Sequence, residues 1–233
     1  VWPPHDTYRD LYQLIQKAKR LAPEKSVVLA AYIKPFQNAA DEASVIKAEY
    51  AFRLANAVIL ASGGIQLVHG EEESLLCDSY YAKHAKIRPE FADTVVRYAD
   101  YLVRYAPLLY DDKGYDVSMT ASCGINDDVT ASADNASFSS DGRANTVWMI
   151  LRESKHRLTL HLINLTGNDA LWDTPKNEPE TVRNIRLALR LDAEITGVYC
   201  ASPDGESLEA VELPYQTSRS AYGRIQELTI PEL

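Results

Sequence analysis

Polar and aromatic side chains follow two short apolar segments of the chain, residues 27–33 and 65–69. Carboxylates and imidazoles can transfer protons, while ammonium groups and tyrosine hydroxyls can hydrogen-bond to a polar ligand. The candidate ligand-binding side chains are Tyr32, Lys34, His69, Glu71, Glu72, Asp78 and Tyr80. Each has a structural alternative: a tyrosine in the core, a histidine that holds a turn, a solvated run of charges, or a loop packed on its neighbours. The choice between ligand binding and a structural role therefore depends on the elements that carry these side chains.

Other kinds of catalytic or cofactor site lack their motifs. Ser62-Gly63-Gly64 does not have the Gly-x-Ser-x-Gly spacing of a hydrolase nucleophile, and neither a Walker loop nor Gly-x-Gly-x-x-Gly occurs. The cysteines, at positions 77, 123 and 200, have no zinc-site or disulfide-scaffold spacing. The polar cluster 126–128 lacks the spacing of an EF-hand loop. We expect neither a cofactor nor a metal.

The first half of the chain alternates between helix and strand patterns. The expected elements are a helix over 7–21 with a buried stripe that ends at Leu21, a strand over 27–33, a helix from Asp41 to Gly63, a strand over 65–69 and a helix over 89–109. Such alternation predicts βαβ units and parallel strands. Two strands do not complete a parallel sheet, so another chain or upstream residues must supply the rest. We favour upstream residues.

The pattern changes near residues 111–114, and the second half is typical of an all-β domain. Candidate strands are 145–153, 157–165, 183–191, 196–201, 208–213 and 223–230. Within 158–163, leucines alternate with other residues, which predicts a strand buried on one face. Short strands separated by polar turns predict an antiparallel β-sandwich. The expected fold class is therefore α/β followed by all-β, with one domain over 1–113 and another over 114–233.

Composition excludes some classes of partner. The 233-residue chain has a mass of 26.0 kDa, a net charge of −9 and a pI near 5.1. A nucleic-acid-binding protein normally carries a basic patch, and no run of Lys and Arg occurs. The apolar stretches fall far short of the roughly 18–20 residues that span a bilayer. We expect no nucleic-acid partner and no membrane segment.

Several motifs together resemble the C-terminal part of glycoside hydrolase family 66, which contains endo-dextranases and cycloisomaltooligosaccharide glucanotransferases. The most specific are His161-Leu162-Ile163-Asn164-Leu165 followed by Leu171-Trp172-Asp173, and Ala61-Ser62-Gly63-Gly64 followed by Ile65-Gln66-Leu67-Val68-His69-Gly70-Glu71. Val28-Leu29-Ala30-Ala31-Tyr32 and the region from Val1-Trp2 through the first helix add to them. Residues 112–144 match nothing recognisable.

The resemblance implies a catalytic (β/α)8 TIM barrel followed by a β-sandwich. Residues 1–113 then correspond to the barrel from its sixth to its eighth helix, and 114–233 to the sandwich. The implied substrate is an α-1,6-glucan such as dextran or an isomaltooligosaccharide, and the implied location is secreted or cell-surface. The upstream part of the same polypeptide would be the chain's partner.

The resemblance also implies a retaining mechanism, with an Asp nucleophile and a Glu acid/base on earlier barrel strands. Neither maps onto this chain, so we assign it no catalytic residue and expect it to be inactive alone. Barrel enzymes bind substrate at the carboxyl ends of their strands, where the candidate side chains lie. Glu71 matches the family's Gly-Glu after the last strand, whereas Lys34 and His69 depart from the family pattern.

Two other functions fit parts of the sequence. A non-catalytic carbohydrate-binding or scaffold module would use exposed aromatics such as Trp148, Trp172 or Tyr215 as a stacking platform. Burial of Trp148 would count against that interpretation. A glycosidase of an α-amylase-like family would share the barrel and sandwich plan, but its catalytic residues would lie on different strands.

Overall fold

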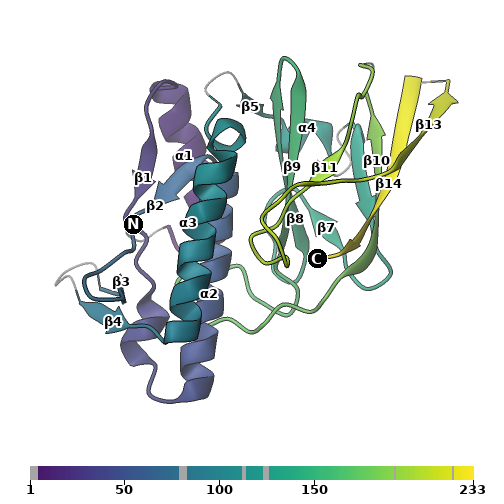
Figure 1. Ribbon diagram of the computed structural model, residues 1–233. Coiled ribbons are helices and arrows are strands. Elements are labelled where there is room, and N and C mark those ends of the chain that lie inside the picture. Colours follow the sequence, from purple (N-terminus) through teal and green to yellow (C-terminus); the bar gives the residue numbers. More distant parts are fainter. Residues whose placement is uncertain (1–4, 79–82, 112–113, 123–125, 192, 222) are drawn as a thin grey trace.

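The computed structural model describes residues 5–78, 83–111, 114–122, 126–191, 193–221 and 223–233 (Figure 1). Three layers are stacked side by side: a helical layer formed by residues 5–111, a central sheet and an outer sheet. No helix among these residues combines the length and apolar character needed to cross a membrane. The chain is therefore a mixed α/β structure in which helices cover one side of the sheets.

The helical layer has the expected order of elements. Helix α1 (Tyr8–Leu21) is followed by β1 (Val27–Leu29), α2 (Glu42–Ala61), β2 (Gly64–Gln66) and α3 (Pro89–Leu109). Helix α1 begins with a capping box between Thr7 and Asp10, which satisfies free backbone N–H groups of the first turn. Asp41 caps α2 in the same way. Strands β1 and β2 pair in parallel, with Val28 opposite Ile65.

Strand β1 is much shorter than expected, because the chain leaves the ladder after Leu29. Ile33 is buried but donates its backbone N–H to Leu76 O of β3 (Ser74–Leu76) rather than to β2. The 3-10 helix η1 (Lys34–Asn38) and a hairpin of β3 with β4 (His84–Lys86) were not expected. Leu21 is also exposed, so the predicted stripe of α1 ends one turn earlier than expected.

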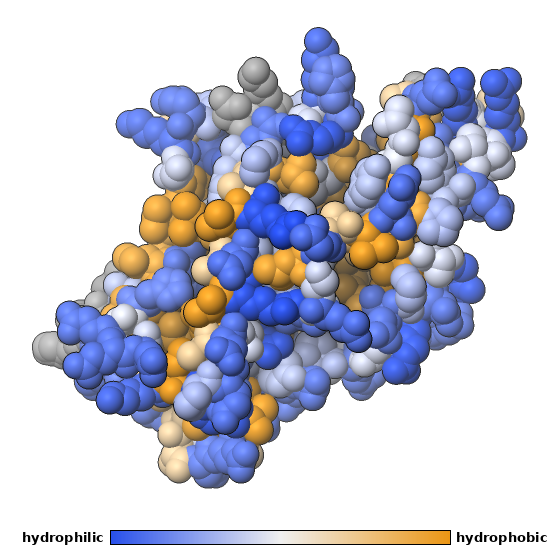
Figure 2. All heavy atoms as spheres, viewed as in Figure 1, coloured by the Kyte–Doolittle hydropathy of each residue, from blue (hydrophilic) through white to orange (hydrophobic). Residues whose placement is uncertain are grey.

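One face of the β1–β2 pair is uncovered. Gly64 and Gln66 point toward the helices and are buried, whereas Val28 is 54% exposed and Leu67, just beyond β2, is 47% exposed. Figure 2 shows apolar side chains reaching the surface on the helical-layer side of the molecule. This distribution agrees with the expectation that two strands do not complete the sheet.

The second half forms two sheets that face each other across a core. The central sheet contains β5 (Tyr115–Asp116), β7 (Phe138–Ser139), β8 (Val147–Ser154) and β9 (Arg157–Asn164). The outer sheet has the order β13 (Tyr215–Ser220), β14 (Gly223–Glu232), β10 (Arg183–Arg190), β6 (Val129–Ser132). Helix α4 (Ser118–Ala121) and the pair β11 (Tyr199–Cys200) with β12 (Val211–Glu212) complete the unit. Strands β6 and β13 were not expected, and β7 pairs with β8 in parallel, unlike an all-antiparallel sandwich.

The central sheet is buried on both faces, which corrects the expectation of one buried face. Val147, Met149 and Leu151 of β8 point into the core shared with the outer sheet. Trp148 and Ile150 point the other way, into the core of the helical layer. The residues of β9 alternate in the same way, so Ile163 joins the helical core although Leu162 packs on the other side. The central sheet therefore contributes one face to the core of the helical layer and the other face to the core of the second half.

Polar contacts also connect the helical layer to the second half of the chain. Arg152 of β8 donates hydrogen bonds to the carbonyl oxygens of Leu109 and Asp111, where α3 ends. Asp204, from a loop beyond β11, accepts hydrogen bonds from the Tyr98 hydroxyl at 2.8 and 2.9 Å and pairs with Arg53 at 3.0 Å. Burial and the charge of Asp204 raise the pKa of Tyr98 well above its usual value. These contacts join α2 and α3 to the sheets.

Candidate functional site

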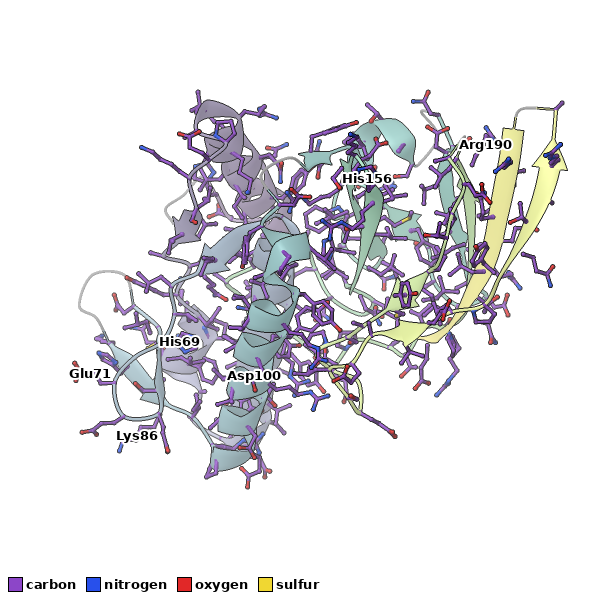
Figure 3. The ribbon with its side chains drawn as sticks, turned by 45° about the horizontal axis from the view of Figure 1, so that its top comes forward. His69, Glu71, Lys86, Asp100, His156 and Arg190 are labelled. Atoms are coloured by element: carbon purple, nitrogen blue, oxygen red, sulfur yellow. The ribbon has the colours of Figure 1, made fainter. Side chains whose placement is uncertain are left out.

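The candidate side chains gather at one edge of the helical layer. Strands β1 and β2 are parallel, so the segments that follow them emerge at the same edge. We call these segments, residues 30–38 and 67–78, the rim. Figure 3 shows His69 and Glu71 of the rim beside Lys86 of β4, far from His156 and Arg190. The sequence-predicted residues of both segments therefore lie in one region.

The two rim segments are tied together by hydrogen bonds. Ile33 N–H donates to Leu76 O at 3.1 Å, and Gln37 Nε2 donates to Asp78 Oδ2 at 2.9 Å. Lys83 lies 3.7 Å from the same Asp78 oxygen. Asp78 is thus partly buried and contacted by Gln37 of the other rim segment and by Lys83, which lies just beyond the rim.

The turn after β2 is held by a histidine that sequence reasoning missed. Glu71 N–H donates to His84 Nδ1 at 3.2 Å, so that nitrogen carries a lone pair and the other ring nitrogen carries the proton. Ser74 Oγ lies 3.2 Å from the same ring nitrogen and donates to the carbonyl oxygen of Glu71. Glu72 adopts a left-handed conformation, with φ of 51°. The backbone of Glu71 is therefore fixed while its side chain is exposed.

The remaining predicted side chains differ in exposure. Lys34, His69 and Glu72 are exposed, and Tyr32 is half-buried. His69 also pairs through its backbone with Leu75, which places it at the start of the hairpin. Tyr80 lies outside the described residues. The rim thus offers an ammonium group, an imidazole and carboxylates to a ligand along one edge.

Two polar pairs connect elements next to the rim. Gln66 Nε2 donates to Ala31 O at 2.7 Å, which holds the two strand ends in register. Glu49 of α2 accepts hydrogen bonds at 2.8 and 2.7 Å from Arg88, the residue before α3. These hydrogen bonds raise the pKa of the Arg88 guanidinium. Of the Glu49–Arg88 pair, only Arg88 lies in a segment that stands out in the sequence by its charge, the stretch 70–88.

Aromatic platforms in the second half are mostly unavailable. Trp148 is 0% exposed, and Trp172 is 6% exposed with its ring N–H donated to His5 O at 2.7 Å. The Tyr215 hydroxyl donates to Ile195 O at 2.8 Å. Tyr215 also lines a groove of about 550 Å³ over the outer sheet. Burial of Trp148 counts against a stacking platform, by the criterion stated above.

Metal binding finds no support in the described part of the chain, where no group of three or more His, Cys, Asp or Glu residues could hold an ion. The Cys123 position lies outside the described residues.

Comparisons with known proteins agree on one family. The sequence model of glycosyl hydrolase family 66 matches residues 1–233. Two cycloisomaltooligosaccharide glucanotransferases of Niallia circulans are 31% identical over 192 residues and 32% identical over 190. Each alignment covers 79% of this chain but 19% of the relative, so the chain spans about a fifth of the length of these relatives.

A solved structure shows the same similarity. The crystal structure of a cycloisomaltooligosaccharide glucanotransferase from Paenibacillus sp., complexed with cycloisomaltoheptaose, is 30% identical to this chain, with a TM-score of 0.70. The match covers 79% of this chain and 26% of that chain.

Proposed function

Because the chain belongs to glycosyl hydrolase family 66, we propose that it is the C-terminal portion of a retaining enzyme that acts on α-1,6-glucan. The reaction is endo-hydrolysis of dextran or cyclising transglycosylation. Both begin with the same covalent glycosyl-enzyme intermediate and differ in whether water or a sugar hydroxyl receives the glycosyl group.

The uncovered face of the β1–β2 pair is the observation that carries this proposal. Val28 and Leu67 are apolar and exposed there, while the opposite face packs on α1 and α2. Neighbouring strands from the upstream part of the same polypeptide would cover this face and close a (β/α)8 barrel. The rim would then lie at the substrate-binding end of that barrel. In this arrangement residues 114–233 form the flanking β-sandwich domain.

The two parts of the polypeptide have different roles in this proposal, as the family resemblance implies. The upstream part supplies the Asp nucleophile and the Glu acid/base, whose carboxyl groups must lie about 5–5.5 Å apart. This chain binds and orients the glucan. The carboxylate of Glu71 and the ring of His69 accept or donate hydrogen bonds to sugar hydroxyls, and the half-buried ring of Tyr32 packs on the apolar face of a sugar. The remaining binding residues are Lys34, Glu72, Asp78 and Tyr80.

The test compares this chain with a longer polypeptide that joins it to the upstream region. The longer polypeptide should release reducing ends or cyclic isomaltooligosaccharides from dextran, and this chain alone should not. Glu71→Gln should raise KM about five- to tenfold, because a neutral acceptor oxygen replaces a charged one, a difference of about 1–1.4 kcal/mol. Glu227→Gln is the matched control, since Glu227 is also exposed but lies on the outer sheet. Equal KM values for the two variants would remove Glu71 from the substrate site.

Dextran is a polymer, so the enzyme meets it outside the cell, and we place the whole protein in the secreted or cell-surface class. Activity on dextran that remains with intact cells or appears in the culture medium would support this location. Activity released only on lysis would contradict it.

A further inference from the structure

A loop of the second half holds the segment that leads into the first helix. Tyr8 N–H donates to Ala170 O at 2.9 Å, and Trp172 N–H donates to Asp6 O at 3.1 Å. The Trp172 ring adds its hydrogen bond to His5 O. We call residues 166–177 the clamp loop. It pairs with residues 5–8 almost as a strand would, including an antiparallel bridge between Thr7 and Leu171.

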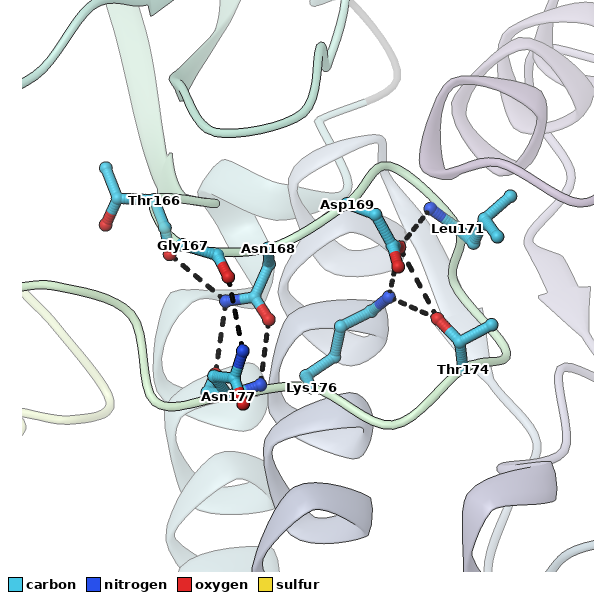
Figure 4. Close-up of polar contacts among 8 residues, drawn as sticks. All are labelled: Thr166, Gly167, Asn168, Asp169, Leu171, Thr174, Lys176 and Asn177. Atoms are coloured by element: carbon cyan, nitrogen blue, oxygen red, sulfur yellow. Dashed lines mark hydrogen bonds and ion pairs between the residues drawn. The ribbon is translucent and has the colours of Figure 1, made fainter.

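Polar groups within the clamp loop are hydrogen-bonded to one another (Figure 4), and Asn168 and Lys176 among them are buried. Lys176 Nζ donates to Asp169 Oδ1 at 2.6 Å and to Thr174 Oγ1 at 2.5 Å, although the Lys176 side chain is 0% exposed. Asp169 also accepts the N–H of Leu171 at 2.8 Å. A second brace links Asn168 to the backbone of the clamp loop at position 177, where Asn177 N–H donates to Asn168 Oδ1 at 2.8 Å.

Lys176 connects these braces to the helical layer. Its ammonium lies 5.6 Å from the centre of the Tyr8 ring, within the range of a cation–π contact. Its backbone N–H donates to Lys47 O of α2 at 3.0 Å. The ammonium of Lys176 is enclosed while the carboxylate of Asp169 is 54% exposed, so the pair adds little net stability but gives the buried ammonium one set of partners. Such a cluster is therefore suited to positioning a segment.

The segment that is held lies toward the rim end of the helical layer. The second half of α1 packs near the start of β2, where a side chain at Gly64 would meet Ile15 and one at Gly63 would meet Lys19. Residues 22–26 then lead directly into β1, so α1 runs opposite to β1 and β2. Residues 5–8, at the other end of α1, therefore lie toward the edge at which β1 and β2 finish.

We propose that the clamp loop positions residues 5–8 at the substrate-binding edge, so that the second half of the chain sets the geometry of the site. Trp172 and Lys176 are its positioning residues. The inference rests on the proposed function, because it assigns the rim edge to substrate. A displacement of about 1 Å at such an edge lowers turnover strongly while leaving substrate affinity largely intact.

The experiment uses Trp172→Phe and Lys176→Met, with Lys47→Met as the control. Trp172→Phe keeps an aromatic ring and removes the N–H that His5 O accepts. Lys47 also contacts the clamp loop, but only its backbone carbonyl oxygen does so, by accepting the N–H of Lys176, and its side chain is exposed. Two quantities are measured: hydrogen exchange of the Tyr8 amide in this chain, and kcat and KM on dextran in the longer polypeptide. Thermal unfolding identifies a variant that fails to fold.

We expect the Tyr8 amide to exchange at least about fivefold faster in both clamp variants, and kcat to fall about tenfold with KM changed less than twofold. Lys47→Met should match the wild type. Lys176→Arg, which keeps the charge, should recover part of the kcat lost in Lys176→Met.

Two outcomes would overturn the inference. Unchanged Tyr8 exchange in folded Trp172→Phe and Lys176→Met would show that the clamp loop does not hold the segment. Faster exchange with wild-type kcat would show that the segment does not position the site. If the wild-type longer polypeptide does not act on dextran, the proposed function fails, and Tyr8 exchange alone decides whether the clamp exists.

Discussion

Acidification should destabilise the contact between the two halves through His161. This residue lies on β9, which packs against α2, and its Nε2 has neither solvent access nor a hydrogen-bond partner. Burial, and secondarily the positive charge of Arg152, lower the pKa of His161 from 6.5 to about 4. The folded state therefore keeps the ring neutral where an unfolded chain would protonate it.

The sign and size of the effect follow from proton linkage. Between pH 6.5 and 4 the unfolded state binds the proton and the folded state does not, so the free energy of unfolding falls as the pH falls. Each pH unit across this window is worth about 1.4 kcal/mol. The contribution of His161 to the loss between pH 7 and pH 4.5 is roughly 2 to 2.5 kcal/mol, and it stops growing below about pH 4.

Urea denaturation at pH 7 and pH 4.5 measures this loss. Carboxylates elsewhere in the protein titrate in the same range, so the wild type is compared with His161→Leu, which has no titrating group at this position. The variant should lose roughly 2 to 2.5 kcal/mol less than the wild type over the interval. His156→Gln, in the exposed turn between β8 and β9, should behave as the wild type. An equal loss in the wild type and His161→Leu would refute the reasoning.

Two further perturbations test the packing. Glu49→Ala removes both hydrogen bonds that Arg88 donates to a carboxylate and leaves its guanidinium only the weaker pair with Glu42 at 3.9 Å. Since the Arg88 side chain is 38% exposed, the loss should be about 2–3 kcal/mol rather than the 3–5 of a fully buried pair, and a loss below about 1 kcal/mol in chemical denaturation would contradict this reasoning. Gly142→Ala and Gly167→Ala both place a side chain at positive φ, 68° and 69°, which costs about 1–2 kcal/mol. At Gly142 the new Cβ would also lie 2.9 Å from the Trp148 ring, whereas nothing lies within 4 Å at Gly167. Gly142→Ala should therefore lower the melting temperature more, and equal melting temperatures would count against this packing.

The elements predicted well from sequence are those whose signals are local. Thr7 with Asp10 and Asp41 mark helix starts through bonds that span three residues, and Pro89 begins α3 because it lacks the N–H that a first turn does not use. The period of apolar residues likewise identified α2 and α3. The family was also recognisable, because its motifs are short runs of adjacent residues.

The rim was predicted in part. The candidate residues after β1 and β2 do share one edge, because parallel strands end together. The hairpin of β3 and β4 was missed because residues 70–88 show no alternation, and its pairing depends on partners such as His84 that are distant in sequence. Ligand binding by Asp78 stays a prediction, and in the structure its carboxylate accepts a hydrogen bond from Gln37.

The sequence by itself determined where α1, α2 and α3 begin, which face of each is apolar apart from the last turn of α1, and to which family the chain belongs. Only the tertiary structure decided what those faces meet. Residues 147–151 of β8 form an uninterrupted apolar run, which is typical of a strand buried on both faces, but the run does not say which element covers each face, so the packing of Trp148 against the helical layer could not be predicted. The clamp loop is the clearest case. Its hydrogen bonds to residues 5–8 join positions more than 150 apart in the chain, and no local sequence pattern records a contact that exists only once both halves are folded.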